Sequence, residues 1–402
     1  MKNPGLPRLL LTALLLLAKA SGLPPAVSPQ PVPTPAAPGA LGSSLAQAPD
    51  GTVCLSWLEP AGGEVWALKF SRFDAARQRW SEAHLIARGA DFFVNWADFP
   101  ILAAQSGRLT AVWFVLNPAK GGGHHGGTYR AVHSVSTDGG TTWSPPQPVT
   151  TESTAVEFVT LQPLRDGRLL AAWLDGRTHD RTALYARVLG AAGPDTRVDG
   201  SVCDCCQLSF VPLTDGGALL AYRGRTEDEI RDMQLARFDG RTWGRPAALH
   251  ADGWKIAGCP VNGPQLAAHG DLVGAVWFTA ADNQARVLAR VSANAGGTFG
   301  PVARVDLDRP QGRGDSVMLA DGTLVMTWLE MTGEKSGQQG GLYLRTLSRE
   351  GRLSEPRLLA PSRTSPMSGF PRMVLLGGRQ LLLTCTQEGE PSQILTFLVE
   401  VK

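Results

Sequence analysis

The stretch "DGRLLAAW", Asp166–Trp173, places an Asp-Gly turn before a short apolar strand that ends in a tryptophan. Five more segments repeat this order, a turn with Gly followed by an apolar run, and end in Trp57, Trp113, Tyr222, Trp277 and Trp328. A seventh segment, "GGRQLLLTC", ends in Cys385, and successive end residues lie 49 to 60 residues apart. Recurrence at such a spacing indicates a repeat architecture.

Each of the first six repeats also contains four short strands: an apolar run before the turn, the run that ends in the aromatic residue, and two more. Asp-Gly turns favour tight hairpins because both central residues accept positive φ. Four-stranded antiparallel units repeated around an axis form a β-propeller. The sequence therefore predicts an all-β chain with seven blades, and a six-bladed ring is the alternative.

The seventh repeat has only three recognisable strands, so the ring needs one more. The N-terminal segment "VSPQPV" (27–32) is similar to "WSPPQPV" (143–149), which ends the second repeat. We therefore expect residues 21–40 to be a Pro/Ala-rich linker, part of which supplies the closing strand, and residues 41–402 to be the propeller.

Residues 1–20 have the features of a secretory signal peptide. Lys2 and Arg8 precede an apolar run at 9–17, and the small residues Ala18 and Ala20 follow. The apolar run is much shorter than the roughly 20 residues of a membrane span. We expect cleavage near Ala20, a secreted or periplasmic location and no membrane span.

The charge balance argues against nucleic acid and anionic membranes as partners. The chain has 38 Lys and Arg against 36 Asp and Glu, a net charge of +2, and no basic run that would follow a phosphate backbone. We expect no nucleic-acid partner, no cofactor apart from the metal alternative considered below, and a monomer.

The turn "STDGGTTW" (136–143), between the third and fourth strands of the second repeat, has the pattern Ser-x-Asp-x-Gly-x-Thr-Trp. A looser copy, "SANAGGTF" (292–299), occupies the same place in the fifth repeat. Asp138 can accept backbone N–H groups within the turn, and Gly140 permits the tight bend. These roles are local, so we assign the turns to stiffening of the blades.

The turn pattern and the repeats together resemble the Asp-box, or BNR-repeat, propellers of the sialidase superfamily, and uncharacterised exported bacterial sialidase-like proteins in particular. The resemblance implies a glycan or glycoconjugate partner and, if the chain is an enzyme, a glycoside hydrolase of exo-alpha-sialidase type. In that family arginines hold the substrate carboxylate, an Asp is the acid/base, and a Tyr paired with a Glu is the nucleophile.

Propeller connectivity brings the blade-to-blade connections and the loops between second and third strands to one face, where binding sites usually lie. Arginine suits a carboxylate substrate because its planar guanidinium binds carboxylates bidentately. The predicted catalytic residues on this face are Asp98, Arg177, Arg225, Glu227, Asp228 and Arg313.

The segment "VCDCCQ" (202–207) supplies three of the six cysteines, and a fourth, Cys259, lies in the next blade connection. Equivalent connections of adjacent blades are close in space, so we expect Cys203, Cys205, Cys206 and Cys259 to gather. In an exported chain we favour a disulfide between Cys259 and one of the trio. The alternative is a zinc or copper site formed by the same thiols, with His124 or His125.

The function therefore has two alternatives at this stage. One is a secreted sialidase-like propeller that binds or hydrolyses glycans at its loop face. The other is a non-catalytic binding propeller whose cysteine cluster forms disulfides or holds a soft metal ion.

Overall fold

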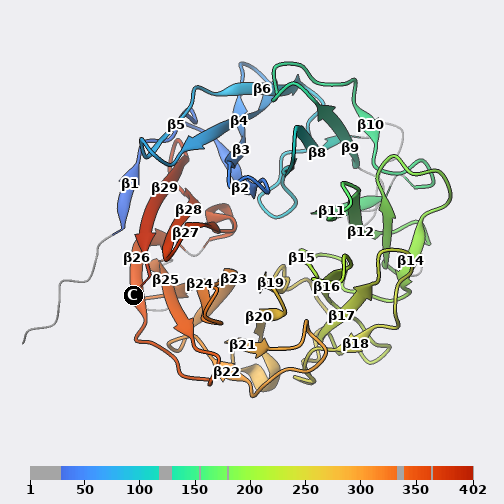
Figure 1. The fold of residues 1–402 in the computed structure, drawn as a ribbon, viewed down its shortest axis with the longest axis vertical. Coiled ribbons are helices and arrows are strands. Elements are labelled where there is room, and N and C mark those ends of the chain that lie inside the picture. The colour runs from blue at the N-terminus through green and yellow to red at the C-terminus, as the bar shows by residue number, and fades with distance from the viewer. Residues whose placement is uncertain are drawn as a thin grey trace, which may run out of the picture.

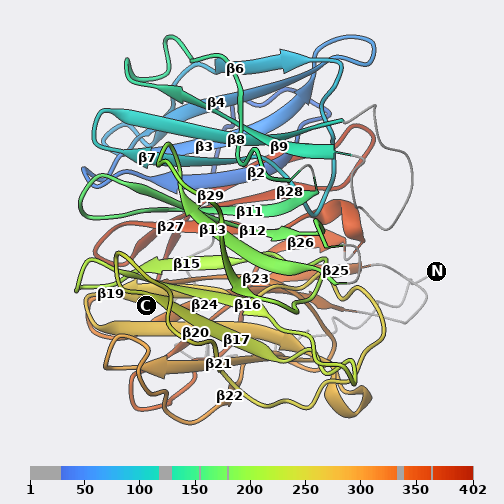
Figure 2. The same cartoon turned by 90° about the vertical axis from the view of Figure 1, so that its right-hand side faces the viewer.

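The computed structural model describes residues 29–116, 129–153, 155–178, 181–332, 339–363 and 365–401. They form seven antiparallel sheets arranged as blades around a central axis (Figure 1). Figure 2 shows the same ring edge-on, with strands running between its two faces. The prediction of seven antiparallel blades is confirmed, and the six-bladed alternative is wrong. Six blades have four strands, and the sheet of the first blade has a fifth strand that pairs with its third. The predicted signal peptide at 1–20 and the histidines at 124 and 125 lie outside the described residues.

The first four blades follow one another along the chain. The first holds β2 (Leu41–Gln47), β3 (Val53–Pro60), β4 (Trp66–Asp74), β5 (Arg79–Trp80) and β6 (His84–Gly89). The second holds β7 (Ile101–Gln105), β8 (Arg108–Leu116), β9 (Tyr129–Ser136) and β10 (Gln147–Pro148). The third holds β11 (Val156–Pro163), β12 (Leu169–Asp175), β13 (Ala183–Val188) and β14 (Thr196–Asp199). The fourth holds β15 (Ser209–Pro212), β16 (Ala218–Arg223), β17 (Met233–Phe238) and β18 (Ala247–Ala248).

The last three blades complete the ring. The fifth holds β19 (Gln265–His269), β20 (Leu272–Thr279), β21 (Arg286–Ser292) and β22 (Ala303–Arg304). The sixth holds β23 (Pro310–Met318), β24 (Leu324–Met331), β25 (Gln339–Leu347) and β26 (Arg357–Arg363). The seventh holds β27 (Arg372–Gly377), β28 (Gln380–Gln387), β29 (Gln393–Glu400) and β1 (Gln30–Val32). Two short 3₁₀ helices are η1 (Ala281–Asn283) and η2 (Pro366–Ser368), and no described helix is long and apolar enough to cross a membrane.

The N-terminal strand closes the ring. β1 pairs antiparallel with β29, with Gln30 opposite Leu398 and Val32 opposite Thr396. The Thr396 hydroxyl donates to the Val32 carbonyl at 2.7 Å and accepts from Trp80 Nε1 of the first blade at 3.0 Å. This hydroxyl therefore links the last blade to the first through the N-terminal segment.

The residues that end the repeat motif are the packing centres of the blades. All seven lie on the second strand of a blade and are 0 to 9% exposed: Trp57, Trp113, Trp173, Tyr222, Trp277, Trp328 and Cys385. Inner strands contact one another in sequence around the axis, and β27 meets β2. The apolar repeat thus fills the interfaces between neighbouring blades.

The Asp-box turn has the predicted structure. Asp138 Oδ1 accepts the backbone N–H groups of Thr141 and Thr142 at 3.1 and 3.0 Å. Gly140 adopts φ +84°, and a Cβ there would lie 2.2 Å from Phe70 Cζ. In the fifth blade Asn294 replaces the Asp and accepts from the Thr298 N–H at 2.8 Å. These turns are structural.

Candidate functional site

Blade connections and second-to-third strand loops meet at one end of the strands, which we term the loop face. Isolated β-bridges join these segments at Val202 and Gly224 and at Ile230 and Lys255. Because the strands of a blade alternate in direction, the Asp-box turns between third and fourth strands lie at the opposite face. The loop face is therefore the place where polar side chains from several blades can meet.

Three polar side chains from different segments meet at the centre of the loop face. Asp98 lies in the connection to the second blade, Tyr129 begins β9, and Glu157 is the second residue of β11. Asp98 Oδ2 accepts the Tyr129 hydroxyl at 2.9 Å and the Phe158 N–H at 3.0 Å. Phe158 adopts φ +50° where the β11–β12 register shifts. This bulge brings the start of β11 to Asp98.

Burial raises the pKa values of Asp98, Glu157 and Tyr129. Asp98 is 4% exposed, and burial raises its pKa to about 7 against the lowering effect of hydrogen bonds from Phe158 and Tyr129. Burial, followed by the charge of Asp98, raises the pKa of Glu157 to about 9. Burial also raises the pKa of Tyr129. At neutral pH both carboxyl groups are therefore able to carry a proton, which a general acid requires.

A cavity of about 60 Å³ lies beside Asp98. Its wall includes Phe158 from β11, Gln207 at the end of the cysteine segment, and Arg372 at the start of β27. The Arg372 guanidinium lies over the Phe99 ring at 5.5 Å. The cavity thus combines a protonatable carboxyl, an amide and a cation in an aromatic wall.

An aromatic cluster of Trp96, Phe99 and Phe370 continues this wall. The Trp96 and Phe370 rings are stacked with centroids 5.9 Å apart, and Phe99 lies 6.0 Å from Phe370. The Arg313 guanidinium lies 4.9 Å from the Trp96 ring centre and donates to the Ser365 carbonyl at 2.5 Å. Burial lowers the pKa of Arg313 to about 10, so it remains a cation at neutral pH.

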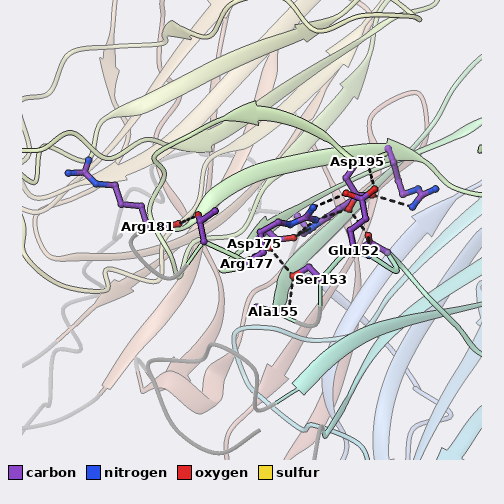
Figure 3. Close-up of polar contacts among 11 residues, drawn as sticks. Glu152, Ser153, Ala155, Asp175, Arg177, Arg181 and Asp195 are labelled. Carbon is purple, nitrogen blue, oxygen red and sulfur yellow. Dashed lines mark hydrogen bonds and ion pairs between the residues drawn. The ribbon is translucent and has the colours of Figure 1, made fainter. Parts of the chain in front are cut away.

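Arg177 lies in a separate ion-pair network of the third blade (Figure 3). Its Nη2 is 2.7 Å from both Asp175 Oδ2 and Asp195 Oδ2, and its Nη1 is 3.1 Å from Glu152 Oε2. The guanidinium also stacks 3.9 Å from the Tyr185 ring centre. Its Nη1 and Nη2 groups and its guanidinium face are used within the protein, so this arginine has a structural role.

The fourth-blade loop carries three further predicted catalytic residues. Arg225 forms a salt bridge with Glu229 at 2.6 Å, and the other Glu229 oxygen bonds Arg231. Glu227 has an 89% exposed side chain, and Asp228 is exposed. Neither acid is buried beside Asp98. This loop therefore forms a polar rim and does not supply the acid group of the central cavity.

The cysteine trio gathers as predicted, without a disulfide. Cys203 Sγ lies 3.8 Å from Cys205 Sγ and 3.5 Å from Cys206 Sγ, whereas an S–S bond is about 2.05 Å. All six cysteines of the chain are free thiols in this structure, including buried Cys54 and Cys385. The favoured Cys259 bridge is thus not formed. Hydrogen bonds from Cys205 and Cys206 lower the pKa of Cys203.

The family model of the BNR repeat-like domain matches residues 62–255. This segment contains the complete Asp box and the second, third and fourth repeats. Over these residues the chain is similar to BNR repeat-like domains, and its fold is a seven-bladed β-propeller. No curated protein matches it.

Several solved structures are similar to this chain. A protein of unknown function from Dyadobacter fermentans has 14% identity and a TM-score of 0.51, covering 94% of this chain and 99% of that one. An ulvan lyase from a new family of polysaccharide lyases, bound to -[GlcA(1-4)Rha3S]-, has 12% identity and a TM-score of 0.53, with 93% and 94% covered. The intramolecular trans-sialidase from Ruminococcus gnavus has 11% identity and a TM-score of 0.47, with 80% and 93% covered.

Of the six predicted catalytic residues, the propeller places two around one aromatic cluster. Asp98 lies between Trp96 and Phe99 in the chain, and Arg313 lies over Trp96. The others are separate for physical reasons, because Arg177 and Arg225 are neutralised by nearby carboxylates and the other two are exposed: Glu227 and Asp228.

Sequence reasoning missed Tyr129 and Glu157 as members of the site. Glu157 has a readable signal, since it is a charged residue inside the apolar inner strand "VEFV". Tyr129 has none, because it is one of four tyrosines and follows a Gly-rich stretch of sequence. Only the fold brings its hydroxyl to Asp98.

Proposed function

We propose that this sialidase-like propeller binds an acidic glycan at the centre of its loop face and cleaves a glycosidic bond there, with Asp98 as the general acid. Support comes from the shared fold with an ulvan lyase bound to a uronic acid-containing oligosaccharide. It also comes from the chemistry of the site itself.

The burial of the Asp98 carboxyl at the edge of the cavity is the observation that carries the proposal. Glycoside hydrolysis uses a carboxylic acid of raised pKa to protonate the leaving oxygen. Asp98 borders the central cavity, and its pKa is raised to about 7. The exposed Asp228 lacks such an environment.

Tyr129 and Glu157 support Asp98 in different ways. The Tyr129 hydroxyl donates to Asp98 Oδ2 and so orients the carboxyl. This hydrogen bond leaves Asp98 Oδ1 available to another partner. Glu157, with its raised pKa, is a second protonatable carboxyl beside the same hydroxyl. An Asp together with a Tyr–Glu pair is the set of residue types that the sialidase resemblance implies.

The cations of the site favour an acidic sugar. Arg372 borders the cavity, and Arg313 lies on the adjoining aromatic cluster. A guanidinium recognises a carboxylate through paired hydrogen bonds, as a sialic or uronic acid would allow. The exo-alpha-sialidase activity is the specific form of this proposal.

Hydrolysis of fluorogenic glycosides, with α-sialosides and uronides as separate arms, tests the proposal. We expect Asp98→Asn to lower kcat by about 10²–10⁴-fold, the range that general acid catalysis contributes. The control is Asp282→Asn, because Asp282 is exposed on η1 with φ +56°, which Asn accepts. Equal turnover by wild type and Asp98→Asn would exclude Asp98 as the acid.

A non-catalytic binding propeller is the second candidate, because the size of the cavity argues against cleavage at Asp98. About 60 Å³ holds one or two waters but no sugar ring, and Asp98 is only 4% exposed, so a glycan bound on the loop face would not reach this carboxyl. Calorimetric titration with acidic oligosaccharides that are not turned over separates the two functions. Binding without turnover of any glycoside would support this candidate and contradict cleavage.

A further inference from the structure

The turn at 203–206 directs three sulfurs toward one point. The Cys203 N–H donates to the Arg223 carbonyl at 2.9 Å, which fixes the start of the turn. Gln207 Nε2 donates to the Ala97 carbonyl at 2.9 Å, which fixes its end. The convergence is therefore a property of an anchored backbone.

The sulfur spacing is that of a ligand set. The Cys203 Sγ distances of 3.5 and 3.8 Å are close to the separation of about 3.8 Å that tetrahedral geometry imposes on sulfurs at a Zn–S distance of about 2.3 Å. The Sγ atoms of Cys203, Cys205 and Cys206 all lie within 4.8 Å of one another. One ion between them would contact all three without a change of fold.

A fourth ligand is available from the neighbouring blade connection. Asp204, Cys205 and Cys259 form a second group whose ligand atoms lie within 4.8 Å of one another, so Cys205 belongs to both groups. Cys259 Sγ is 3.9 Å from Asp204 Oδ1. Cys259 is exposed, whereas the trio is 1 to 3% exposed. An ion could reach the buried sulfurs from the Cys259 side.

Arg231 supplies the positive charge that such a group of sulfurs needs. Its Nη1 donates to Cys203 Sγ at 3.2 Å and to Asp204 Oδ1 at 3.1 Å. Its side chain is only 4% exposed. Partners of this kind orient metal ligands and adjust the charge of the site.

The surroundings select a soft ion. The trio packs in one apolar cluster with Phe158, Phe370 and Tyr222. Thiolates in such surroundings prefer Zn²⁺ or Cu(I) over Mg²⁺ or Ca²⁺, which take oxygen ligands.

We propose that Cys203, Cys205 and Cys206, with Cys259 or Asp204 as the fourth ligand, bind one thiophilic d¹⁰ ion, Zn²⁺ or Cu(I). The ion joins the connections that lead into the fourth and fifth blades. It also holds Gln207 on the wall of the central cavity. This site is independent of glycan cleavage and stands if the propeller only binds.

Metal uptake by the reduced full chain under anaerobic conditions tests the proposal. Co²⁺ is the first probe, and we expect one ion per chain with thiolate-to-cobalt charge-transfer absorption. Displacement by Zn²⁺ and transfer of Cu(I) from a chelator form two arms, and the arm with the tighter uptake identifies the ion.

Cysteine substitutions locate the ion. Cys205→Ser should weaken uptake at least tenfold, and Cys385→Ser, a buried thiol of the seventh blade, is the matched control and should bind as wild type does. Cys259→Ser changes an exposed residue, so it tests the fourth ligand in a chain that still folds. Weakened uptake in Cys259→Ser assigns that ligand to Cys259, and unchanged uptake assigns it to Asp204.

Two results would overturn the proposal. One is the absence of Co²⁺, Zn²⁺ and Cu(I) uptake by reduced wild type whose thiols react as free groups. The other is a disulfide within the trio or to Cys259 in the freshly purified protein, found by mass spectrometry after alkylation, because oxidised sulfurs are not ligands of this kind.

Discussion

Acidic residues two positions after a repeat tryptophan hold that tryptophan in place. The indole Nε1 donates to Glu59 Oε2 from Trp57, to Asp175 Oδ2 from Trp173 and to Glu330 Oε2 from Trp328, at 2.6 to 2.8 Å. A buried indole N–H needs such an acceptor. An acid two positions after a repeat tryptophan is therefore structural. Asp98 also stands two positions after a tryptophan, but that residue, Trp96, is not one of the repeat aromatics.

Removal of Asp175 should strongly destabilise the third blade. The Asp175 side chain is 0% exposed. Asp175→Ala leaves Trp173 Nε1 without its acceptor and removes the salt bridge between Asp175 and Arg177. Loss of one partner of a buried ion pair costs about 3–5 kcal/mol. Urea denaturation measures this change in the free energy of unfolding.

The matched control is Glu227→Ala, whose side chain is 89% exposed and should change stability by less than about 0.5 kcal/mol. Similar unfolding free energies for the two variants would show that the Asp175 network does not stabilise the blade.

Asp-box turns illustrate how an element depends on one backbone position. Gly140 and Gly190 both adopt left-handed φ, +84° and +80°. Only Gly140 is crowded, because a Cβ there would lie 2.2 Å from Phe70 Cζ, whereas Gly190 has no atom within 4 Å. The comparison therefore isolates packing of the turn against the first blade from backbone strain.

We expect Gly140→Ala to lower the melting temperature more than Gly190→Ala does. Both substitutions carry the strain of a left-handed Ala, roughly 1–2 kcal/mol, and Gly140→Ala adds the clash with Phe70. Scanning calorimetry gives the two shifts. Equal shifts would mean that the turn moves freely away from the first blade.

Elements were predictable from the sequence to different extents. The inner strands and the Asp-box turns follow from local patterns, such as the apolar run before Trp173 and the Ser-x-Asp-x-Gly order at Asp138. The orientation of the Glu157 side chain depends on the bulge at Phe158. No local sequence pattern indicates this bulge. The gathering of the cysteine trio was predictable because its three members are nearly consecutive in the sequence.

At the scale of the whole molecule, the repeat predicted the ring because every blade buries the same kind of strand. The N-terminal strand β1 lies beside β29, as the similarity of 27–32 to 143–149 indicated. The centre of the site was less predictable, since Asp98, Tyr129 and Glu157 come from segments that only ring closure brings together. Arg177 was predicted as catalytic because it is an arginine on the loop face. Its ion pairs with Asp175 and Asp195 could not be predicted from the sequence.

The proposed function assigns to Asp98 the role of a general acid at the loop face. Since burial raises the pKa of Asp98 to about 7, its carboxyl carries the proton below pH 7 and loses it above. A general acid acts only when protonated, so activity should fall as pH rises through this value. The Tyr129 hydrogen bond lowers the pKa of Asp98, so its removal should move the fall to higher pH.

The pH dependence of kcat/KM for a fluorogenic acidic glycoside, in wild type and Tyr129→Phe, tests the role of Asp98. We predict a constant kcat/KM below about pH 7, a decline above it in wild type, and a decline displaced to higher pH in Tyr129→Phe. A wild-type profile that is flat between about pH 5 and 9, or a decline that Tyr129→Phe leaves in place, would contradict the assignment of Asp98.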